Sequence, residues 1–293
     1  MAPETRPFRF GLIVDSREAT RRSVIELARR AEGLGISILL GTDHLGRWAT
    51  LPLLQVAAQA TTLRIGSLVL NNDLRHPAVL AQELATMDLV TDGRLEIGLG
   101  AGWNRREYES AGISFDPAPM RVARMEASVR ILKQALSEGR IEREADDAYP
   151  AMHMAGVPRS VQRPHPPILV GGGRRRLLSF AAREADIVAI DPRSMPGGGH
   201  DDGDVTEADV DRKIGWIREA AGERWTQLEI NVVLLDVGPA VDPALHGSPH
   251  YLAGESDEMV ERLLARRERW GITYICMRPK QLDAMEPLVR KLA

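Results

Sequence analysis

Short apolar runs alternate with longer helical patterns along the whole chain, and this alternation constrains the fold more than any other feature. Eight runs predict strands, at residues 8–14, 36–41, 64–70, 95–99, 168–171, 187–190, 228–234 and 274–277. Several are almost continuously apolar, which is typical of parallel strands buried on both faces. The sequence therefore predicts an α/β protein with a parallel sheet.

Apolar residues spaced three and four apart fill the gaps between these runs, as in Val24, Ala28 and Ala31. Such stripes are helix faces that pack on a sheet. Thr206 and Asp209 have the spacing of a capping box that opens one of these helices. Eight βα units favour a closed (β/α)8 TIM barrel over an open doubly wound sheet, which stays the alternative.

Length and charge narrow the class of protein. A single barrel domain over residues 1–293 fits the length, since such barrels need about 250 residues plus insertions. Formal net charge is −3, without the basic excess that nucleic-acid binding requires. No apolar run is long enough for a signal peptide or a membrane span. With one cysteine, Cys276, the chain is expected to be cytoplasmic, with neither nucleic acid nor membrane as a partner.

Three long segments interrupt the alternation and predict lid insertions after strands 4, 6 and 7. Residues 138–166 are charged and then rich in proline, with a hairpin expected around 143–157. Residues 192–205 combine glycines with an acidic run and are expected to be the most mobile. Residues 237–255 show no strong element.

Barrel enzymes carry their active sites at the carboxyl ends of the strands, so the residues that follow each strand are the candidates. Asp15, Asp73, Asp191 and Asp236 follow four of the strands and suit ordinary turns. Gly171, Gly172 and Gly173 follow the fifth strand, just before a helix that starts near Arg174. Glycine lets a ligand approach the backbone, and a helix N-terminus attracts an anion, so this turn predicts a phosphate site.

Two further strand ends carry specific chemistry. Asp43 and His44 follow the second strand, and a histidine can transfer a proton near neutral pH. Gly98, Gly100 and Gly102 alternate at the fourth end, where a close backbone approach to a flat ring or a phosphate fits. Their spacing does not match a dinucleotide fingerprint. The sequence shows no metal-ligand motif and no nucleophile motif.

Four stretches resemble the bacterial luciferase-like family. They are residues 31–45, which include Asp43-His44-Leu45, residues 65–88, residues 92–104 with the alternating glycines, and Pro167 to Gly173. The resemblance covers about residues 8 to 190 strongly and continues more weakly to the end. It implies a (β/α)8 barrel that binds coenzyme F420, a deazaflavin hydride carrier, or FMN, and the deazaflavin-dependent branch looks closest.

The resemblance also implies roles for particular residues. Asp43 and His44 would border the cofactor ring, with His44 as proton donor or acceptor. A non-prolyl cis peptide bond near Ser67, Leu68 and Val69 would support the back of the ring. Trp48 and Trp103 would line the substrate side. The cofactor would contact Gly100, Ala101, Gly102 and Asn104 and, through its phosphate, the turn of Gly171, Gly172 and Gly173.

One residue departs from the pattern. Sugar-phosphate dehydrogenases of the deazaflavin branch carry a catalytic glutamate where this chain has Trp103. Glu107, one helical turn further on, is either its substitute as a catalytic acid or a solvated residue of the first helical turn. Which of these holds decides whether an acid is present at this strand end.

Four functions remain open, the last of them a cofactor-binding protein without turnover. The first is F420-dependent hydride transfer to or from a small organic substrate, for which arginines at the mouth, Arg75, Arg174–Arg176 and Arg278, suit the acidic tail of the deazaflavin. The second is an FMN-dependent monooxygenase that uses O2 and a separate cofactor reductase. The third is a non-redox phosphate-binding barrel enzyme, although no strand end shows the lysine such enzymes use. A homodimer is the expectation that the family gives.

Overall fold

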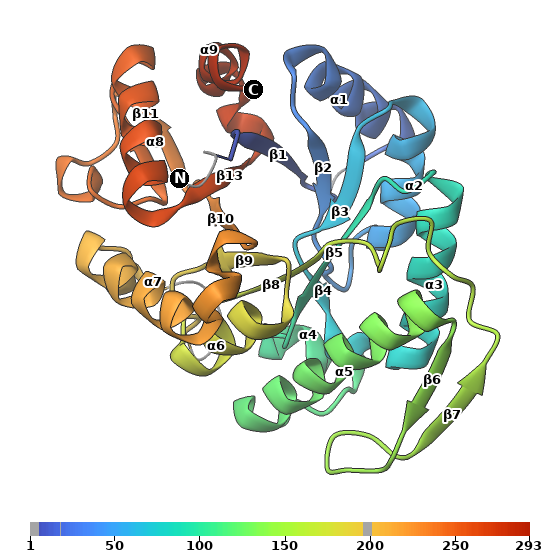
Figure 1. Ribbon diagram of the computed structural model, residues 1–293. Coiled ribbons are helices and arrows are strands. Elements are labelled where there is room, and N and C mark those ends of the chain that lie inside the picture. Colours follow the sequence, from blue (N-terminus) through green and yellow to red (C-terminus); the bar gives the residue numbers. More distant parts are fainter. Residues whose placement is uncertain (1–5, 18, 196–200) are drawn as a thin grey trace.

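The computed structural model describes residues 6–17, 19–195 and 201–293, and its central feature is a parallel barrel (Figure 1). The strand order is β3-β2-β1-β13-β10-β9-β8-β5, and β3 also pairs with β5, which closes the ring. The eight strands are β1 Arg9–Val14, β2 Ile38–Gly41, β3 Arg64–Ser67, β5 Leu95–Gly100, β8 Ile168–Gly172, β9 Ile187–Ile190, β10 Glu229–Val233 and β13 Ile272–Met277. The predicted (β/α)8 barrel is confirmed, and each predicted strand is present.

Helices surround the barrel and pack their apolar stripes on the outside of the sheet (Figure 1). In α1, for example, Val24, Ala28 and Ala31 are buried at the predicted spacing. The capping box of Thr206 and Asp209 is also confirmed at the start of α7. The helices are α1 Arg21–Leu34, α2 Thr50–Ala60, α3 Pro77–Val90, α4 Arg105–Ala111, α5 Ala118–Glu138, α6 Arg175–Glu184, α7 Glu207–Ala221, α8 Ser256–Trp270 and α9 Leu282–Leu292.

The third predicted run, residues 64–70, forms two strands instead of one. β3 ends at Ser67 and β4 covers Leu70–Asn71, with a cis peptide bond between Leu68 and Val69 as the family resemblance implied. The Ser67 hydroxyl accepts from the Gly98 N–H and donates to the Gly98 carbonyl, both at 2.9 Å. Because the Ser67 side chain occupies the N–H and carbonyl of Gly98, the backbone hydrogen bonds between these neighbouring strands are interrupted here.

A second, smaller core fills the inside of the barrel. It contains Ile13, Ile38, Leu40, Leu169, Ile187, Ala189, Tyr274 and Cys276, with Leu68, Val69 and Val233 partly buried against it. Because side chains fill the interior, a ligand can reach the strands only at their ends.

A charged cluster lies at the amino ends of the strands. Arg9, the first residue of β1, bonds Glu96 of β5 at 2.5 Å and Glu229 of β10 at 2.7 Å. Arg64 of β3 bonds the same Glu96 at 2.7 Å. The cluster ties four strands together at the end of the barrel opposite the candidate site.

The first irregular segment contains the expected hairpin, β6 Arg140–Arg143 and β7 Met152–Ala155, which lies outside α5 (Figure 1). Further along, Gln162 contacts Arg64 and the carbonyl of Leu95, the first residues of β3 and β5. The end of this segment therefore lies at the amino ends of the strands. Tyr149, between the hairpin strands, reaches toward the other end through Asn72, and a lid role for the segment stays a prediction.

The third irregular segment contains more structure than its sequence suggested. β11 Asp236–Gly238 and β12 Tyr251–Ala253 pair in parallel, and a 3-10 turn, η4 Pro243–Leu245, lies between them. The expectation of no strong element was wrong because each strand has three residues, too few to show a hydrophobic period. In the described part of the chain, no helix is long and apolar enough to cross a membrane.

Candidate functional site

The predicted site residues gather at one end of the barrel. Parallel pairing matches Gly41 with Ser67, Asn71 with Gly100, and Gly172 with Ile190, so the carboxyl ends of these strands lie side by side. Asp43, Gly100 and Gly172 therefore belong to one mouth.

Asp43 is almost completely buried and fully engaged in hydrogen bonds. Its carboxylate accepts from both terminal nitrogens of Arg75, at 2.6 and 3.2 Å, and from the Asn71 N–H at 3.0 Å. The Thr50 hydroxyl adds a fourth bond at 3.3 Å. Arg75 is thus used to neutralise Asp43, and its predicted role as a cation for the cofactor tail is wrong.

His44 contacts Glu107, which approaches from the first turn of α4. The distance from Nδ1 of His44 to Oε1 of Glu107 is 2.7 Å, and both side chains are largely buried. Asn104 donates to the same glutamate oxygen at 2.6 Å. An ionised Glu107 accepts from the Nδ1 hydrogen, which leaves Nε2 of His44 as the nitrogen that can exchange a proton with a ligand. The alternative of Glu107 as a solvated helix residue is wrong.

Two predicted substrate residues lie next to this pair. The ring of Trp103 meets the ring of His44 edge to face, with centroids 6.0 Å apart. Trp48 follows His44 in the loop that leads to α2. Both tryptophan side chains are exposed, as residues that meet a substrate must be.

The glycines after β5 are needed for contacts within the chain. A Cβ on Gly98 would lie 2.0 Å from the Ser67 carbonyl oxygen, and one on Gly100 would lie 2.6 Å from Val69. Gly102 has φ +75°, and a Cβ there would lie 1.9 Å from the Tyr108 hydroxyl. The alternation of glycines thus reflects close packing of this loop, and whether it also serves a ligand stays a prediction.

A polar network that the sequence did not reveal holds this loop in place. The Tyr108 hydroxyl bonds Asn71 at 2.9 Å, and burial raises the pKa of Tyr108 well above its usual value. Arg124 bonds both carboxylate oxygens of Asp73 at 2.9 Å. Arg121 donates to the carbonyls of Ala101 and Gly102 at 3.3 and 3.2 Å. An aromatic residue among the charges of α4 was the one available signal.

The turn after β8 combines tight packing with an uncapped helix. A Cβ on Gly172 would lie 2.6 Å from Leu177, and one on Gly173 would lie 2.7 Å from the Arg193 nitrogen. Helix α6 follows, without a side-chain cap at Arg174 and without an acidic residue in its first turn. A helix N-terminus of this kind suits an anion. The arrangement is compatible with the predicted phosphate site at Gly171, Gly172 and Gly173.

Three of the other arginines predicted at the mouth already have partners. Arg175 bonds Glu219 at 2.9 Å and Arg176 bonds Glu126 at 2.9 Å, so both lie along the outer helices. Arg278 donates to the Leu234 carbonyl at 3.3 Å. Arg175 and Arg176 thus have carboxylate partners and Arg278 a backbone carbonyl, and whether these three arginines attract an acidic tail stays a prediction.

The second irregular segment is anchored on its described side by a buried ion pair. Lys213 of α7 contacts Asp204 at 2.7 Å and also donates to the carbonyls of Asp191 and Asp204. Residues 192–205 were expected to be the most mobile, and residues 196–200 of this range lie outside the described residues. Lys213 is a lysine near a strand end that the sequence reading missed, but its three donors are used for structure.

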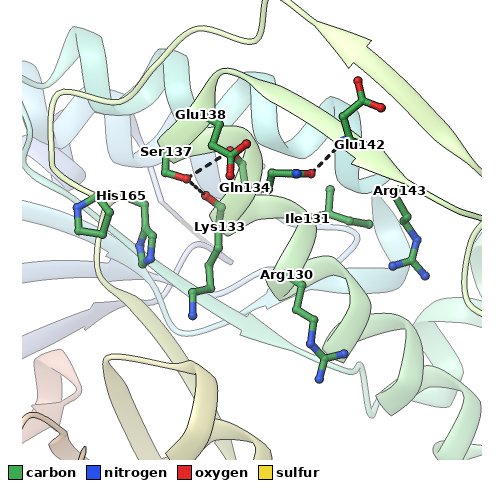
Figure 2. Close-up of a pocket in the computed structure, with 10 residues that line it drawn as sticks. Arg130, Ile131, Lys133, Gln134, Ser137, Glu138, Glu142, Arg143 and His165 are labelled. Atoms are coloured by element: carbon green, nitrogen blue, oxygen red, sulfur yellow. Dashed lines mark hydrogen bonds between the residues drawn. The ribbon is translucent and has the colours of Figure 1, made fainter.

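A hollow of about 500 Å³ lies beside α5 (Figure 2). It is lined by the second half of α5 and by Arg143 and His165. Lys133 there bonds Glu184, and His165 lies 4.0 Å from Asp186. Glu184 and Asp186 both lie just before β9 in the chain. It therefore belongs to the amino-end side of the barrel, and the strand-end mouth remains the candidate site.

The model of the luciferase-like monooxygenase family matches residues 7–198. The F420-dependent glucose-6-phosphate dehydrogenase of Kineococcus radiotolerans is 30% identical over 191 residues, which are 62% of this chain and 56% of that protein. The FMNH2-dependent dimethylsulfone monooxygenase of Pseudomonas putida is 31% identical over 121 residues, 41% of this chain and 33% of that one. The chain thus spans only about half the length, or less, of these two relatives.

Solved structures give the same fold. The coenzyme F420-dependent tetrahydromethanopterin reductase of Methanopyrus kandleri superposes with a TM-score of 0.78 at 18% identity, covering 98% of this chain and 99% of that one. At this identity the likeness concerns the fold alone. The barrel, its closed order of strands and the match over residues 7–198 lead to one conclusion: the chain belongs to the luciferase-like monooxygenase family.

Proposed function

We propose that the protein is an oxidoreductase that uses coenzyme F420 and exchanges a hydride between this deazaflavin and a small organic substrate. The observation that carries the proposal is the contact of His44 with Glu107 at the mouth where the glycine turns also lie. Similar proteins include F420-dependent enzymes, named for glucose 6-phosphate and for tetrahydromethanopterin.

The residues present fit such a cofactor. The uncapped N-terminus of α6 suits the phosphate, and Leu68 and Val69 are partly exposed above the inner core, where a flat ring can rest. Ser67, Gly100, Ala101, Gly102 and Asn104 complete the proposed cofactor wall. The hydroxyl of Ser16, buried at the end of β1, has no hydrogen-bond partner among the described residues, so it can serve a ligand. When bound, the deazaflavin supplies a two-electron hydride donor or acceptor.

The chain itself supplies binding and proton exchange. Asp43 orders the loop by its bonds to Arg75 and the Asn71 backbone. His44 exchanges the proton through Nε2, while Glu107 holds the ring by Nδ1. Glu107 is therefore a positioning residue in this proposal, and Trp48 and Trp103 contact the substrate.

The second candidate is an FMN-dependent monooxygenase with a separate reductase. It is favoured by the similarity to the dimethylsulfone monooxygenase and by the pairing of Arg175 and Arg176, which removes two cations from the acidic tail of F420. The non-redox phosphate-binding barrel has no such support, because Lys213 is committed to Asp204. A homodimer and a cytoplasmic location remain predictions.

The test is a titration of the purified chain with F420 and with FMN, followed by protein fluorescence. We expect saturable binding of F420 and weak binding of FMN. Tight binding of FMN together with turnover that consumes O2 would favour the second candidate instead.

A matched pair of histidine variants tests the proton role. His44→Ala should lower kcat by about a hundredfold or more while the Kd for the cofactor changes little. His153→Ala is the control, because His153 makes a similar contact with Glu142, at 2.8 Å, on the exposed hairpin. Equal kcat values for the two variants would remove His44 from the reaction.

A further inference from the structure

The mouth beside His44 exposes an unusual amount of apolar surface. Leu45 is 40% exposed, Trp48 37% and Trp103 42%. We call these three side chains the aromatic rim, after its two tryptophans. They come from the loops after β2 and β5, which the contacts of His44 with Trp103 and Glu107 join. Large apolar side chains left in water on the loops of one strand-end mouth are typical of a binding site.

The rim contains the two most exposed of the five tryptophans. Trp270 is buried, and Trp216 and Trp225 are half-buried on the outer helices. Exposure of large aromatic surface is costly in water, and it is offset when a ligand covers that surface. The ring of Trp103 contacts His44, and this contact supports the inference that the ligand is the molecule on which His44 acts.

Three arginines from the segments around the rim already have carboxylate partners. Arg75 bonds Asp43 at 2.6 Å, Arg47 lies 3.7 Å from Asp15, and Arg105 lies 3.8 Å from Glu109. A phosphate or carboxylate on the substrate would have to compete with these carboxylates. Arg106, exposed one residue before Glu107, is a further cation that a charged substrate could use.

We propose that the substrate is an uncharged molecule with a flat, apolar ring that packs against the aromatic rim, and that it is not a sugar phosphate. This inference rests on the proposed function and narrows it to one class of substrate. It differs from what the name of the Kineococcus relative says of that protein. The rim supplies ring contacts, and one polar group of the substrate faces Nε2 of His44.

The test compares two fluorescent probes with the same naphthalene ring, 2-naphthol and 2-naphthyl phosphate, of which the second carries an anionic phosphate group. Their binding to the cofactor-loaded chain is followed by fluorescence anisotropy. We expect 2-naphthol to bind at least about tenfold more tightly than its phosphate ester. Trp48→Ala and Trp103→Ala should each weaken the binding of 2-naphthol by about tenfold, as truncation of an aromatic contact does in general.

Three further variants serve as controls. Trp48→Phe should keep most of the affinity, because it keeps a ring at the rim. Trp225→Ala, on the outer surface, and Arg106→Gln should leave the affinity for 2-naphthol unchanged. If an alanine variant fails to fold, the ratio of the affinities of the unaltered chain for the two probes still tests the proposal.

Two outcomes would overturn the proposal. The first is tighter binding of 2-naphthyl phosphate that Arg106→Gln abolishes, which means a charged substrate. The second is binding of neither probe, together with a dimer that Trp103→Ala dissociates in sedimentation, which means that a second copy of the chain covers the rim.

The same measurements separate this proposal from the proposed function. Turnover of F420 with glucose 6-phosphate, without affinity for 2-naphthol, would contradict the proposed class of substrate and still support the proposed oxidoreductase function. Binding of 2-naphthol by a chain that binds neither F420 nor FMN would contradict the proposed oxidoreductase function and support the aromatic rim as a binding site for a ring.

Discussion

Two neighbouring residues at the end of β2 have different chemical roles because their partners differ. Asp43 accepts four hydrogen bonds, two of them from Arg75, so its carboxylate is fully occupied within the chain. His44 uses one ring nitrogen for Glu107 and keeps the other for a ligand. In the proposed function, proton exchange therefore belongs to His44, and Asp43 gives the loop its shape.

Glu107 is expected to matter through His44. Glu107→Gln keeps the side-chain shape and loses the charge that fixes the imidazole, so kcat should fall by about tenfold to a hundredfold with little change in KM. Steady-state kinetics measure this split. Glu109→Gln is the matched control, since Glu109 lies on the same short helix and faces Arg105 at 3.8 Å. A rise in KM with unchanged kcat would mean that Glu107 binds substrate.

Glycines have opposite roles in different elements. In the loop after β5, Gly102 has a positive φ and lies against Tyr108, so no larger residue fits. In helix α1, Gly33 is exposed and a Cβ there would meet nothing within 4 Å. A glycine inside a helix costs stability relative to alanine, whereas the loop glycine is required.

A pair of alanine variants tests this difference. Gly33→Ala should raise the free energy of unfolding by about 0.5–1 kcal/mol. Gly102→Ala should lower it by about 1–3 kcal/mol, because the backbone conformation is unfavourable and Tyr108 must move. Urea denaturation measures both values. Equal effects of the two substitutions would contradict the packing described here.

Helices α7 and α8 are joined by a carboxylate whose state depends on pH. Asp211 accepts from the Trp270 indole N–H at 2.7 Å and from Arg269 at 2.6 Å, and these bonds lower its pKa, the Trp270 bond most. Its folded pKa is below the unfolded one, so its contribution to stability is present above the unfolded pKa. That contribution is lost as the pH falls through the folded pKa.

Asp211→Asn should therefore destabilise the protein at neutral pH. The difference from the unaltered chain should shrink as the pH falls from about 5 to about 3, because Asp211 becomes protonated in that range. Denaturation curves at several pH values measure the difference. A difference that stays constant with pH would show that Asp211 contributes only through shape.

The whole barrel is held at its two ends by different chemistry. At the carboxyl ends, loops leave His44 and the aromatic rim open to a ligand. At the amino ends, Arg9 connects β1 to Glu96 of β5 and Glu229 of β10 across the ring. This separation leaves the mouth open to change while the closed end fixes the fold.

Loss of Arg9 is expected to be costly for the whole molecule. Arg9→Leu leaves two buried carboxylates without their shared cation, and the free energy of unfolding should fall by about 3 kcal/mol. Thermal and urea denaturation measure the loss. Arg30→Leu is the control, since Arg30 pairs with Asp283 on the exposed surface and should change stability by less than about 1 kcal/mol. Similar losses would mean that the cluster is not part of barrel closure.

The sequence by itself determined the eight strands, the helix faces, the capping box and the strand ends that form the mouth. It could do so because apolar spacing and turn residues are local properties, set by which face of an element is buried. The bend at Leu68 and Val69 came from family resemblance and not from any local pattern.

Only the tertiary structure decided which polar residues meet. Glu107 lies 63 positions from His44, and Arg75 lies 32 from Asp43, so no periodicity links them. The same holds for the pairing of Arg175 and Arg176 with outer glutamates and for the course of residues 138–166 toward the amino ends. Charged side chains have several possible partners along a sequence, and closure of the barrel selects among them by bringing one within hydrogen-bond distance.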